Sequence, residues 1–186
     1  MTTKDFAAWM IRVVCGVKLL PVEALPSTPA VYFANHSSHL DFTTIWAALP
    51  KKIRTRVRPV AGRDYWEKTP RRRRIARDFF NAVLIERRRV TVATNPLEPM
   101  LAALDAGDSL IVFPEGTRSS DGTVHDFKSG LHHLARARPH IVLVPIYLQD
   151  LNRILPKGDL LPVPLLGSLS RGAPMQARPA SPRVAY

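Results

Sequence analysis

The sequence contains one cysteine, Cys15, in 186 residues. A single thiol cannot form an internal disulfide or supply the several cysteines of a structural zinc site, and it fits a reducing compartment. Acidic side chains are also few, because 15 Asp and Glu stand against 27 Lys and Arg, for a formal net charge of +12. Such a surface attracts nucleic acid, anionic lipid head groups or phosphorylated substrates, and charge alone does not choose among them.

The chain also lacks an apolar run of the ~20 residues that a bilayer-spanning helix needs. The longest apolar stretch near the start, residues 6–20, is interrupted by Arg12 and Lys18, and no small-residue cleavage site of a signal peptide follows it. Its apolar residues recur at helical spacing: Phe6, Trp9, Met10, Val13, Val17 and Leu20. We therefore predict an amphipathic helix within residues 1–22, which either lies in a membrane interface or packs on the core.

Short apolar runs alternate with helical patterns along the rest of the chain. The runs that predict strands are residues 30–34, 56–61, 82–85, 109–113 and 141–146. The patterns that predict helices are residues 40–49, 64–80 with a break at Pro70, 94–106 and 130–138. This alternation is typical of βαβ units and indicates a single α/β domain with a largely parallel central sheet flanked by helices.

We place this domain at residues 23–170, with one further strand expected at residues 160–166. Residues 171–186 are rich in proline, alanine and arginine and show no helical period. The sequence therefore predicts a loose tail from residue 171 to the end.

The stretch Asn35-His36-Ser37-Ser38-His39-Leu40-Asp41 joins the first predicted strand to the helix that follows. Residues five apart on a regular helix are separated by about 140° around the axis. His36 and Asp41 can meet if His36 lies in the turn, Ser37 or Ser38 caps the helix and Asp41 stands in its first turns. Asp41 then holds one ring nitrogen and leaves the other free to accept a proton, as in a general base. For the pair alone, a capping or merely satisfied histidine is the alternative.

Two other predicted strands also end in charged residues. Glu86 and Arg87 follow the third strand, and Pro114-Glu115-Gly116-Thr117-Arg118 follows the fourth. In an open parallel sheet ligands bind beyond the carboxyl ends of the strands. We therefore expect His36 and both charged segments to face one crevice.

The segment after the fourth strand has the parts of an anion site. Gly116 lets backbone approach a ligand closely, Thr117 offers a hydroxyl, and Arg118 presents a planar fork suited to phosphate. Glu115 can hold that arginine or a neighbouring one, and Arg87 can supply a second clamp. The alternative is a structural turn with an ordinary Glu-Arg pair.

Five segments, in order across residues 31–147, resemble the conserved blocks of the glycerolipid acyltransferases, the family that contains the 1-acylglycerol-3-phosphate O-acyltransferases. Residues 35–41 look like the N-H-x4-D block, and residues 81–87, which end in Glu86-Arg87, are similar to the second block. Residues 113–118 look like F-P-E-G-T-R. Residues 127–130 resemble the F-K-x-G that follows it, and residues 144–146 the V-P-[VI] of the fourth block.

The resemblance implies transfer of an acyl group from a thioester to a hydroxyl of a lysophospholipid, most simply 1-acylglycerol 3-phosphate, which gives phosphatidic acid. The donor is acyl-CoA or acyl carrier protein as co-substrate, with no other cofactor and no metal. His36 is then the base and Asp41 its partner. The implied substrate-binding residues are Arg87, Glu115, Gly116, Thr117, Arg118 and Lys128.

The substrates that the resemblance implies predict that the reaction takes place at a membrane face, because exposing a long acyl chain to water costs ~0.8 kcal/mol per CH2. We expect a peripheral or monotopic protein on the cytoplasmic face. The predicted first helix and the arginines from Arg71 to Arg77 would dock on anionic lipid. Family members continue past the fourth block through further strand and helix, and this chain departs from them at residues 171–186.

Two other classes of protein compete with this interpretation. His36, His39 and Asp41 can be read as an H-x-x-H-x-D ligand set of a metal-dependent hydrolase, with His132 and His133 completing it. This reading leaves residues 113–118 unexplained. The basic charge would also suit a nucleic-acid-binding protein, but few aromatic residues interleave the arginine runs and no nucleic-acid module is recognised, so we expect no nucleic-acid partner.

Overall fold

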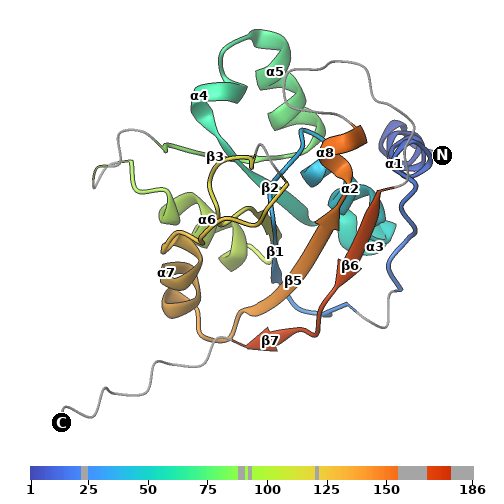
Figure 1. Ribbon diagram of the computed structural model, residues 1–186. Helices are drawn as coiled ribbons and strands as arrows, with labels where there is room; N and C mark the ends of the chain where they lie inside the picture. The colour runs from blue at the N-terminus through green and yellow to red at the C-terminus, as the bar shows by residue number, and fades with distance from the viewer. Residues whose placement is uncertain (22–24, 88–90, 92–93, 120–121, 155–166, 177–186) are drawn as a thin grey trace.

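A computed structural model of the chain describes residues 1–21, 25–87, 91, 94–119, 122–154 and 167–176 (Figure 1). One mixed sheet with the strand order β3-β2-β4-β1-β5-β6 forms its centre, and β7 also pairs with β5. The strands are β1 (Ala30–Ala34), β2 (Val57–Gly62), β3 (Val83–Ile85), β4 (Ser109–Val112), β5 (Val142–Gln149), β6 (Ser168–Arg171) and β7 (Met175–Gln176). The first five strands pair in parallel, which confirms the predicted α/β fold.

Strand β1 lies in the middle of the sheet between β4 and β5. Phe33 pairs with Val112 on one side and with Pro145 on the other. Because the five parallel strands run the same way, the segments that follow β1, β3 and β4 emerge at one edge of the sheet. The fold therefore brings together the three segments that the sequence analysis placed in one crevice.

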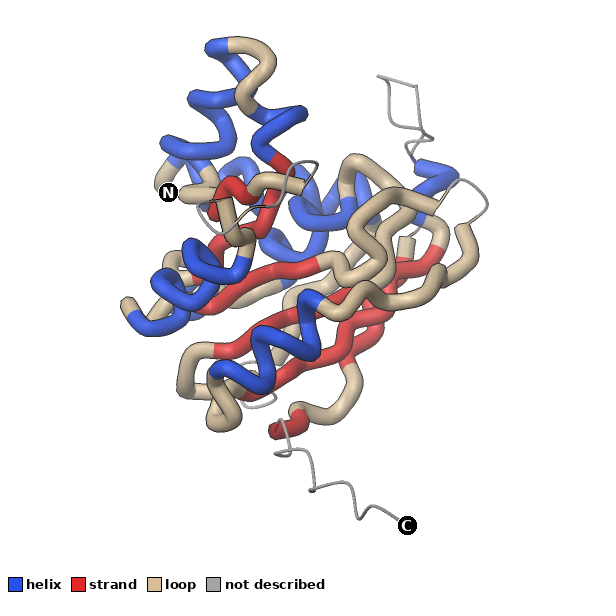
Figure 2. Tube along the Cα trace, turned by 90° about the vertical axis from the view of Figure 1, so that its left-hand side faces the viewer, coloured by secondary structure: helices blue, strands red, loops and turns tan. Residues whose placement is uncertain are grey.

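Helices cover the strands, as Figures 1 and 2 show. They are α1 (Thr3–Cys15), α2 (Asp41–Ala48), α3 (Lys51–Arg54), α4 (Arg63–Trp66), α5 (Pro70–Arg74), α6 (Leu97–Asp105), α7 (Gly130–Ala137) and α8 (Leu151–Ile154). One apolar cluster joins α1 and α2 to the side chains of Tyr32 and Val144, and a second joins α6 and α7 to Val31 and Leu143. Neighbouring residues of β1 and β5 thus point to opposite clusters, as the period of a strand requires.

The predicted break of residues 64–80 at Pro70 is confirmed. Proline starts α5, and the Thr69 side chain caps this helix by accepting a hydrogen bond from the Arg72 N–H at 3.3 Å. The helix continues into a π-helical turn, η2 (Ile75–Phe79), which the sequence pattern did not indicate.

The first helix ends earlier than predicted, at Cys15 rather than near Leu20. Gly16 follows in the left-handed conformation with φ 66°, and its N–H donates to the carbonyl of Arg12. Glycine adopts this conformation without steric cost and so terminates the helix.

Helix α1 leaves its largest apolar side chains in solvent. Phe6 and Trp9 are each 48% exposed and Val13 is 59% exposed. The helix is held to the body partly by charge, because the Asp5 carboxylate contacts Lys51 at 2.8 Å and Arg54 at 2.7 Å. The hydrogen bond from Lys51, with those from Thr2, holds the pKa of Asp5 well below its ordinary value.

The C-terminal region is more regular than predicted up to residue 176. β6 and β7 both pair antiparallel with β5, so ordered pairing continues five residues beyond Arg171. β5 would otherwise be an edge strand with unpaired backbone groups, and short strands satisfy these groups without a hydrophobic pattern of their own. The strand expected at 160–166 and the tail from 177 lie outside the described residues.

Candidate active site

His36 and Asp41 meet at the end of β1 as predicted. The Nδ1 atom of His36 lies 2.7 Å from Oδ2 of Asp41, whose side chain is fully buried. The same oxygen accepts the backbone N–H of Ser37 at 2.6 Å and that of Ser38 at 2.8 Å. The imidazole also stacks on the Phe113 ring, with 4.2 Å between centroids.

The predicted helix cap was wrong in its detail. Residue Leu40 precedes α2, and no side chain caps this helix end. Asp41 instead reaches back to the amides of Ser37 and Ser38, so the carboxylate that orients His36 also satisfies the donors of the turn. Charge-assisted hydrogen bonds of this kind fix both the turn and the imidazole.

Glu115 locks the segment after β4 to the base. Its carboxylate is 3% exposed and accepts the backbone N–H of His36 at 2.8 Å and that of His125 at 3.2 Å. The N–H of Ser119 donates to the carbonyl of His36 at 2.7 Å. No arginine among the described residues forms the expected pair with Glu115, whose two carboxylate oxygens bind backbone amides. The expectation that His36 and this segment come together is confirmed.

Arg87, at the end of β3, reaches the same segment. Its guanidinium donates to the Gly116 carbonyl at 3.2 Å and binds both carboxylate oxygens of Asp64, at 2.8 and 3.1 Å. Gly62 makes room for this side chain, because a Cβ there would lie 2.1 Å from Arg87 Nε. The charge of Arg87 is therefore already paired, which favours a role in holding the loop.

Arg118 and Lys128 have cationic groups without acidic partners in the described part of the chain. The Nη1 atom of Arg118 is buried and has no hydrogen-bond partner there. Gly116 has φ +75°, and a Cβ on it would lie 2.8 Å from the Lys128 ammonium, so this ammonium lies against the glycine backbone. Thr117 is exposed beside them. Two unpaired cations and a free hydroxyl suit a phosphate group.

Sequence reasoning missed a further group of side chains beside the base. The rings of His39 and Tyr65 lie 6.1 Å apart, and the Arg72 guanidinium lies 4.4 Å over the Tyr65 ring. Burial lowers the pKa of His39, and the positive charges of Arg118 and His36 lower it further. The cation over an aromatic ring was not readable from sequence, because α4 and α5 meet only in the folded chain.

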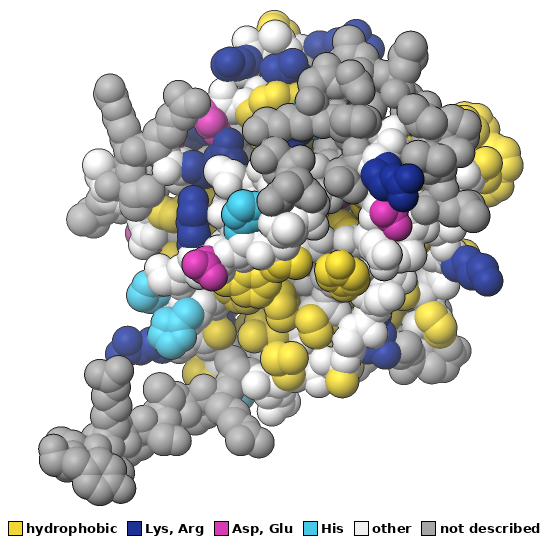
Figure 3. Space-filling model, viewed as in Figure 1, with side chains coloured by type: hydrophobic (Ala, Val, Ile, Leu, Met, Phe, Trp, Pro, Cys, Tyr) yellow, Lys and Arg dark blue, Asp and Glu magenta, His cyan; other side chains and the backbone are white. Residues whose placement is uncertain are grey.

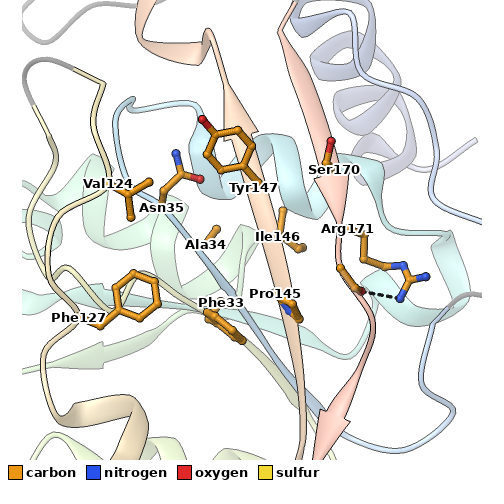
Figure 4. Close-up of a pocket in the computed structure, with 11 residues that line it drawn as sticks. Phe33, Ala34, Asn35, Val124, Phe127, Pro145, Ile146, Tyr147, Ser170 and Arg171 are labelled. Carbon is orange, nitrogen blue, oxygen red and sulfur yellow. Dashed lines mark hydrogen bonds between the residues drawn. The ribbon is translucent and has the colours of Figure 1, made fainter.

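An apolar groove of about 380 Å3 is lined by residues of β1, β5 and β6 and of the loop after β4 (Figure 4). Phe33 and Phe127, whose ring centroids are 6.1 Å apart, form one wall with Val124, and Tyr147 on β5 lies across from them. Asn35, which precedes His36, also lines it and bonds the backbone of Leu148 in both directions at 2.8 Å. Figure 3 shows hydrophobic side chains gathered across this face.

Within the part of the chain that the structure describes, no three His, Cys, Asp or Glu side chains are grouped as a metal site requires. His39 lies against Tyr65, whereas His132 and His133 are both exposed on α7. Among the described residues, His132 and His133 therefore do not join His36, His39 and Asp41 in the ligand set that the metal-hydrolase interpretation requires.

The site and the fold define a member of a known class. Residues 17–149 match the protein family described as Acyltransferase, and the chain belongs to this family. It is 33% identical over 145 residues to the 1-acyl-sn-glycerol-3-phosphate acyltransferase LPAT1, chloroplastic, of Arabidopsis thaliana. The matched region covers 74% of this chain and 37% of that protein. It is 32% identical over 127 residues to the human 1-acyl-sn-glycerol-3-phosphate acyltransferase alpha, covering 67% of this chain and 42% of the relative.

A solved structure shares the fold. The crystal structure of the 1-acyl-sn-glycerophosphate acyltransferase PlsC from Thermotoga maritima superposes with a TM-score of 0.71 at 22% identity, covering 94% of this chain and 70% of that one. The present chain spans roughly two fifths of the length of the two curated relatives described above.

Proposed function

We propose that this protein transfers a fatty acyl group from a thioester, acyl-CoA or acyl carrier protein, to the hydroxyl of 1-acylglycerol 3-phosphate, giving phosphatidic acid. The observation that carries the proposal is the hydrogen bond from the His36 backbone to Glu115, which joins the imidazole-carboxylate pair to a loop with unpaired cations. Membership in the acyltransferase family and the substrates in its relatives' names support it.

The chemistry needs a base, and His36 is placed to act as one. Asp41 binds Nδ1, so Nε2 accepts the proton of the acceptor hydroxyl as its oxygen attacks the thioester carbonyl. The tetrahedral intermediate collapses with cleavage of the C–S bond, and the imidazolium returns its proton to the leaving thiolate. Asp41 stabilises the imidazolium and keeps the ring in place, as the carboxylate does in catalytic triads. No covalent acyl-enzyme and no further cofactor enter these steps.

The phosphate of the acceptor would bind at the loop after β4. Arg118 and Lys128 supply charge, Thr117 a hydroxyl and Gly116 close backbone approach. Arg87 and Glu115 would act by holding this loop, because their charged groups are already bound within the protein. All of these residues are those assigned to substrate binding from the sequence.

The apolar groove is the place for the donor's acyl chain, because it begins at Asn35 next to the base. Each CH2 buried there contributes ~0.8 kcal/mol. Val124→Trp should fill the groove and shift the donor preference to shorter chains, whereas Met175→Trp, which lies outside the groove on β7, should not. An unchanged chain-length profile in Val124→Trp would remove the groove from the mechanism.

We also propose that α1 docks the protein on an anionic membrane, on its cytoplasmic face. No helix among the described residues is long and apolar enough to cross a bilayer. Phe6, Trp9 and Val13 instead form an exposed apolar face, which can insert at the level of the head groups. Co-sedimentation with vesicles containing anionic lipid should fall in the double variant Phe6→Ser, Trp9→Ser. The same loss in Leu19→Ser, an exposed leucine outside α1, would argue against a role for the helix.

One assay tests the reaction itself. Purified protein is given acyl-CoA or acyl carrier protein with glycerol 3-phosphate or a panel of lysophospholipids, and thiol release is measured. We expect release that depends on 1-acylglycerol 3-phosphate and yields phosphatidic acid. Release that is indifferent to the acceptor would indicate a thioester hydrolase instead.

A further inference from the structure

Arg72, Tyr65 and His39 form a line of side chains that the proposed reaction does not use. Arg72 stands over Tyr65 at 4.4 Å, and Tyr65 contacts His39, with 6.1 Å between the rings. His39 in turn experiences the charges of Arg118 and His36. The line therefore runs from the catalytic imidazole outward to helix α5.

Arg72 is a fixed cation without an acidic partner among the described residues. Its neighbours differ, since Arg77 binds Glu67 at 2.6 Å and Arg87 binds Asp64. The aromatic ring holds the guanidinium in place, while leaving its N–H groups available, which is a favourable arrangement for binding an anion. Lys and Arg side chains gather at the top of Figure 3, where Figure 1 places α4 and α5.

The strand order indicates which of the two substrates extends toward Arg72. His36 follows β1, with β5 and β6 on one side of it and β4, β2 and β3 on the other. The apolar groove lies on the β5 side, and α4 and α5, which follow β2, lie on the β3 side. The thioester carbonyl at His36 carries the acyl chain on one side and the sulfur of the donor on the other. An acyl chain in the groove therefore directs the sulfur side of the donor toward α4 and α5.

The acceptor's phosphate fits this position poorly. In 1-acylglycerol 3-phosphate the free hydroxyl and the phosphate sit on adjacent carbons, so the phosphate stays close to His36, where Arg118 and Lys128 lie. In the donor, the long pantetheine arm separates the thioester from the phosphate. Arg72, beyond His39 and Tyr65, is placed for the more distant group.

We propose that Arg72, held on the ring of Tyr65, binds the phosphate ester of the phosphopantetheine arm that coenzyme A and acyl carrier protein share. This inference rests on the proposed acyl transfer and adds a donor subsite to it. Arg72 is a binding residue, and Tyr65 is a positioning residue that acts through it.

The test compares Arg72→Gln with Arg136→Gln, which removes the same charge from an exposed position on α7. Arg72→Gln should raise the KM for acyl-CoA about tenfold, the usual value of one charge-assisted hydrogen bond, with kcat and the acceptor KM near wild type. Arg136→Gln should leave all three unchanged. With acyl-pantetheine, which lacks the phosphate, Arg72→Gln and wild type should behave alike. Tyr65→Phe should retain the donor KM, and Tyr65→Ala should raise it.

Equal effects of Arg136→Gln and Arg72→Gln would overturn the inference, as would a rise in the acceptor KM alone or an equal loss with acyl-pantetheine. A binding measurement tests the donor subsite independently of the transfer reaction. Coenzyme A titrated into wild type should change the tryptophan fluorescence, because Trp66 lies 5.5 Å from Tyr65. Arg72→Gln should weaken the binding of coenzyme A, and pantetheine should not cause the fluorescence change. Equal binding of coenzyme A by wild type and Arg72→Gln would refute the subsite even if no transfer is detected.

Discussion

The two halves of the site differ in how their polar groups are satisfied. Asp41 Oδ2 accepts three hydrogen bonds, from the His36 ring and from the amides of Ser37 and Ser38. In the loop after β4, Arg118 has a buried Nη1 atom without a partner in the described part of the chain. The Oδ1 atom of Asp41 is also buried without a partner there, but its carboxylate is anchored through Oδ2, whereas the buried Nη1 of Arg118 lacks the partner that an anionic substrate would supply.

This contrast predicts different failures in the two halves. Changes at His36 or Asp41 should reduce turnover while the substrate still binds. Changes at Arg118 and its loop should weaken binding of the phosphate-bearing substrate with less effect on turnover.

The largest effect is expected for Asp41→Asn, which keeps the shape of the side chain but removes the carboxylate. The imidazole would lose its orienting acceptor, and kcat should fall ~10²- to 10⁴-fold. Steady-state kinetics with saturating acceptor measures this. Asp41→Ala should also lower the free energy of unfolding by about 1–3 kcal/mol, because buried amides lose their acceptor. A kcat within a few-fold of wild type in Asp41→Asn would remove the carboxylate from the mechanism.

Arg118→Gln should come next and act on binding. Loss of one charge-assisted hydrogen bond costs about 1.5–3 kcal/mol, which is roughly a 10- to 150-fold rise in the acceptor KM. Arg136→Gln, an exposed change on α7, is the control of equal charge. If the acceptor KM moved no more than in this control, Arg118 would not hold the phosphate.

Gly62→Ala should have a smaller effect on the same half. The new Cβ would overlap the Arg87 guanidinium and displace it from Gly116 and Asp64. We expect the acceptor KM to rise several-fold, about 1 kcal/mol, because a positioning contact is lost. Gly130→Ala is the matched control, since a Cβ there meets nothing within 4 Å. Identical kinetics in the two alanine variants would contradict a role of Arg87 in holding the loop.

The smallest expected effect is a change in the pKa of His39. The pKa of His39 should lie below its ordinary value of 6.5, because burial and then the charges of Arg118 and His36 disfavour the imidazolium. Since the folded pKa is lowered, this histidine contributes stability that is present above the unfolded pKa and lost as the pH falls through the folded value. An NMR titration of the histidine rings should show the pKa of His39 rising in Arg118→Gln. A value at or above 6.5 in wild type would contradict the surroundings described here.

The sequence was sufficient for the parts of the site that depend on local spacing and on strand ends. The five-residue separation of His36 and Asp41 predicted their meeting in a turn, and parallel strands predicted that His36, Arg87 and the 115–118 segment share a crevice. His36 and Asp41 do meet, and hydrogen bonds link both His36 and Arg87 to the 115–118 segment. The largely parallel sheet followed from the alternation of apolar runs and helical patterns.

Other features depend on contacts between distant segments and could not be read from the chain. The carboxylate of Glu115 binds the backbone of His36, 79 residues away, rather than an arginine, because backbone amides carry no sequence signal. Arg72 and Tyr65 are close in the sequence, but the guanidinium lies over the ring only because of the turn between α4 and α5, which the sequence pattern does not show. The pairing of β6 and β7 with β5 likewise uses backbone groups, so Arg171, Met175 and Gln176 are in strands although this region was expected to be irregular.

The most direct test of the central claim is the pairing of turnover with acceptor affinity in His36→Ala. We predict that kcat falls at least ~10²-fold, as expected for loss of a positioned base. The dissociation constant for 1-acylglycerol 3-phosphate, measured by calorimetry, should stay within about threefold of wild type, a difference below 1 kcal/mol. Near-normal turnover by His36→Ala would contradict the account.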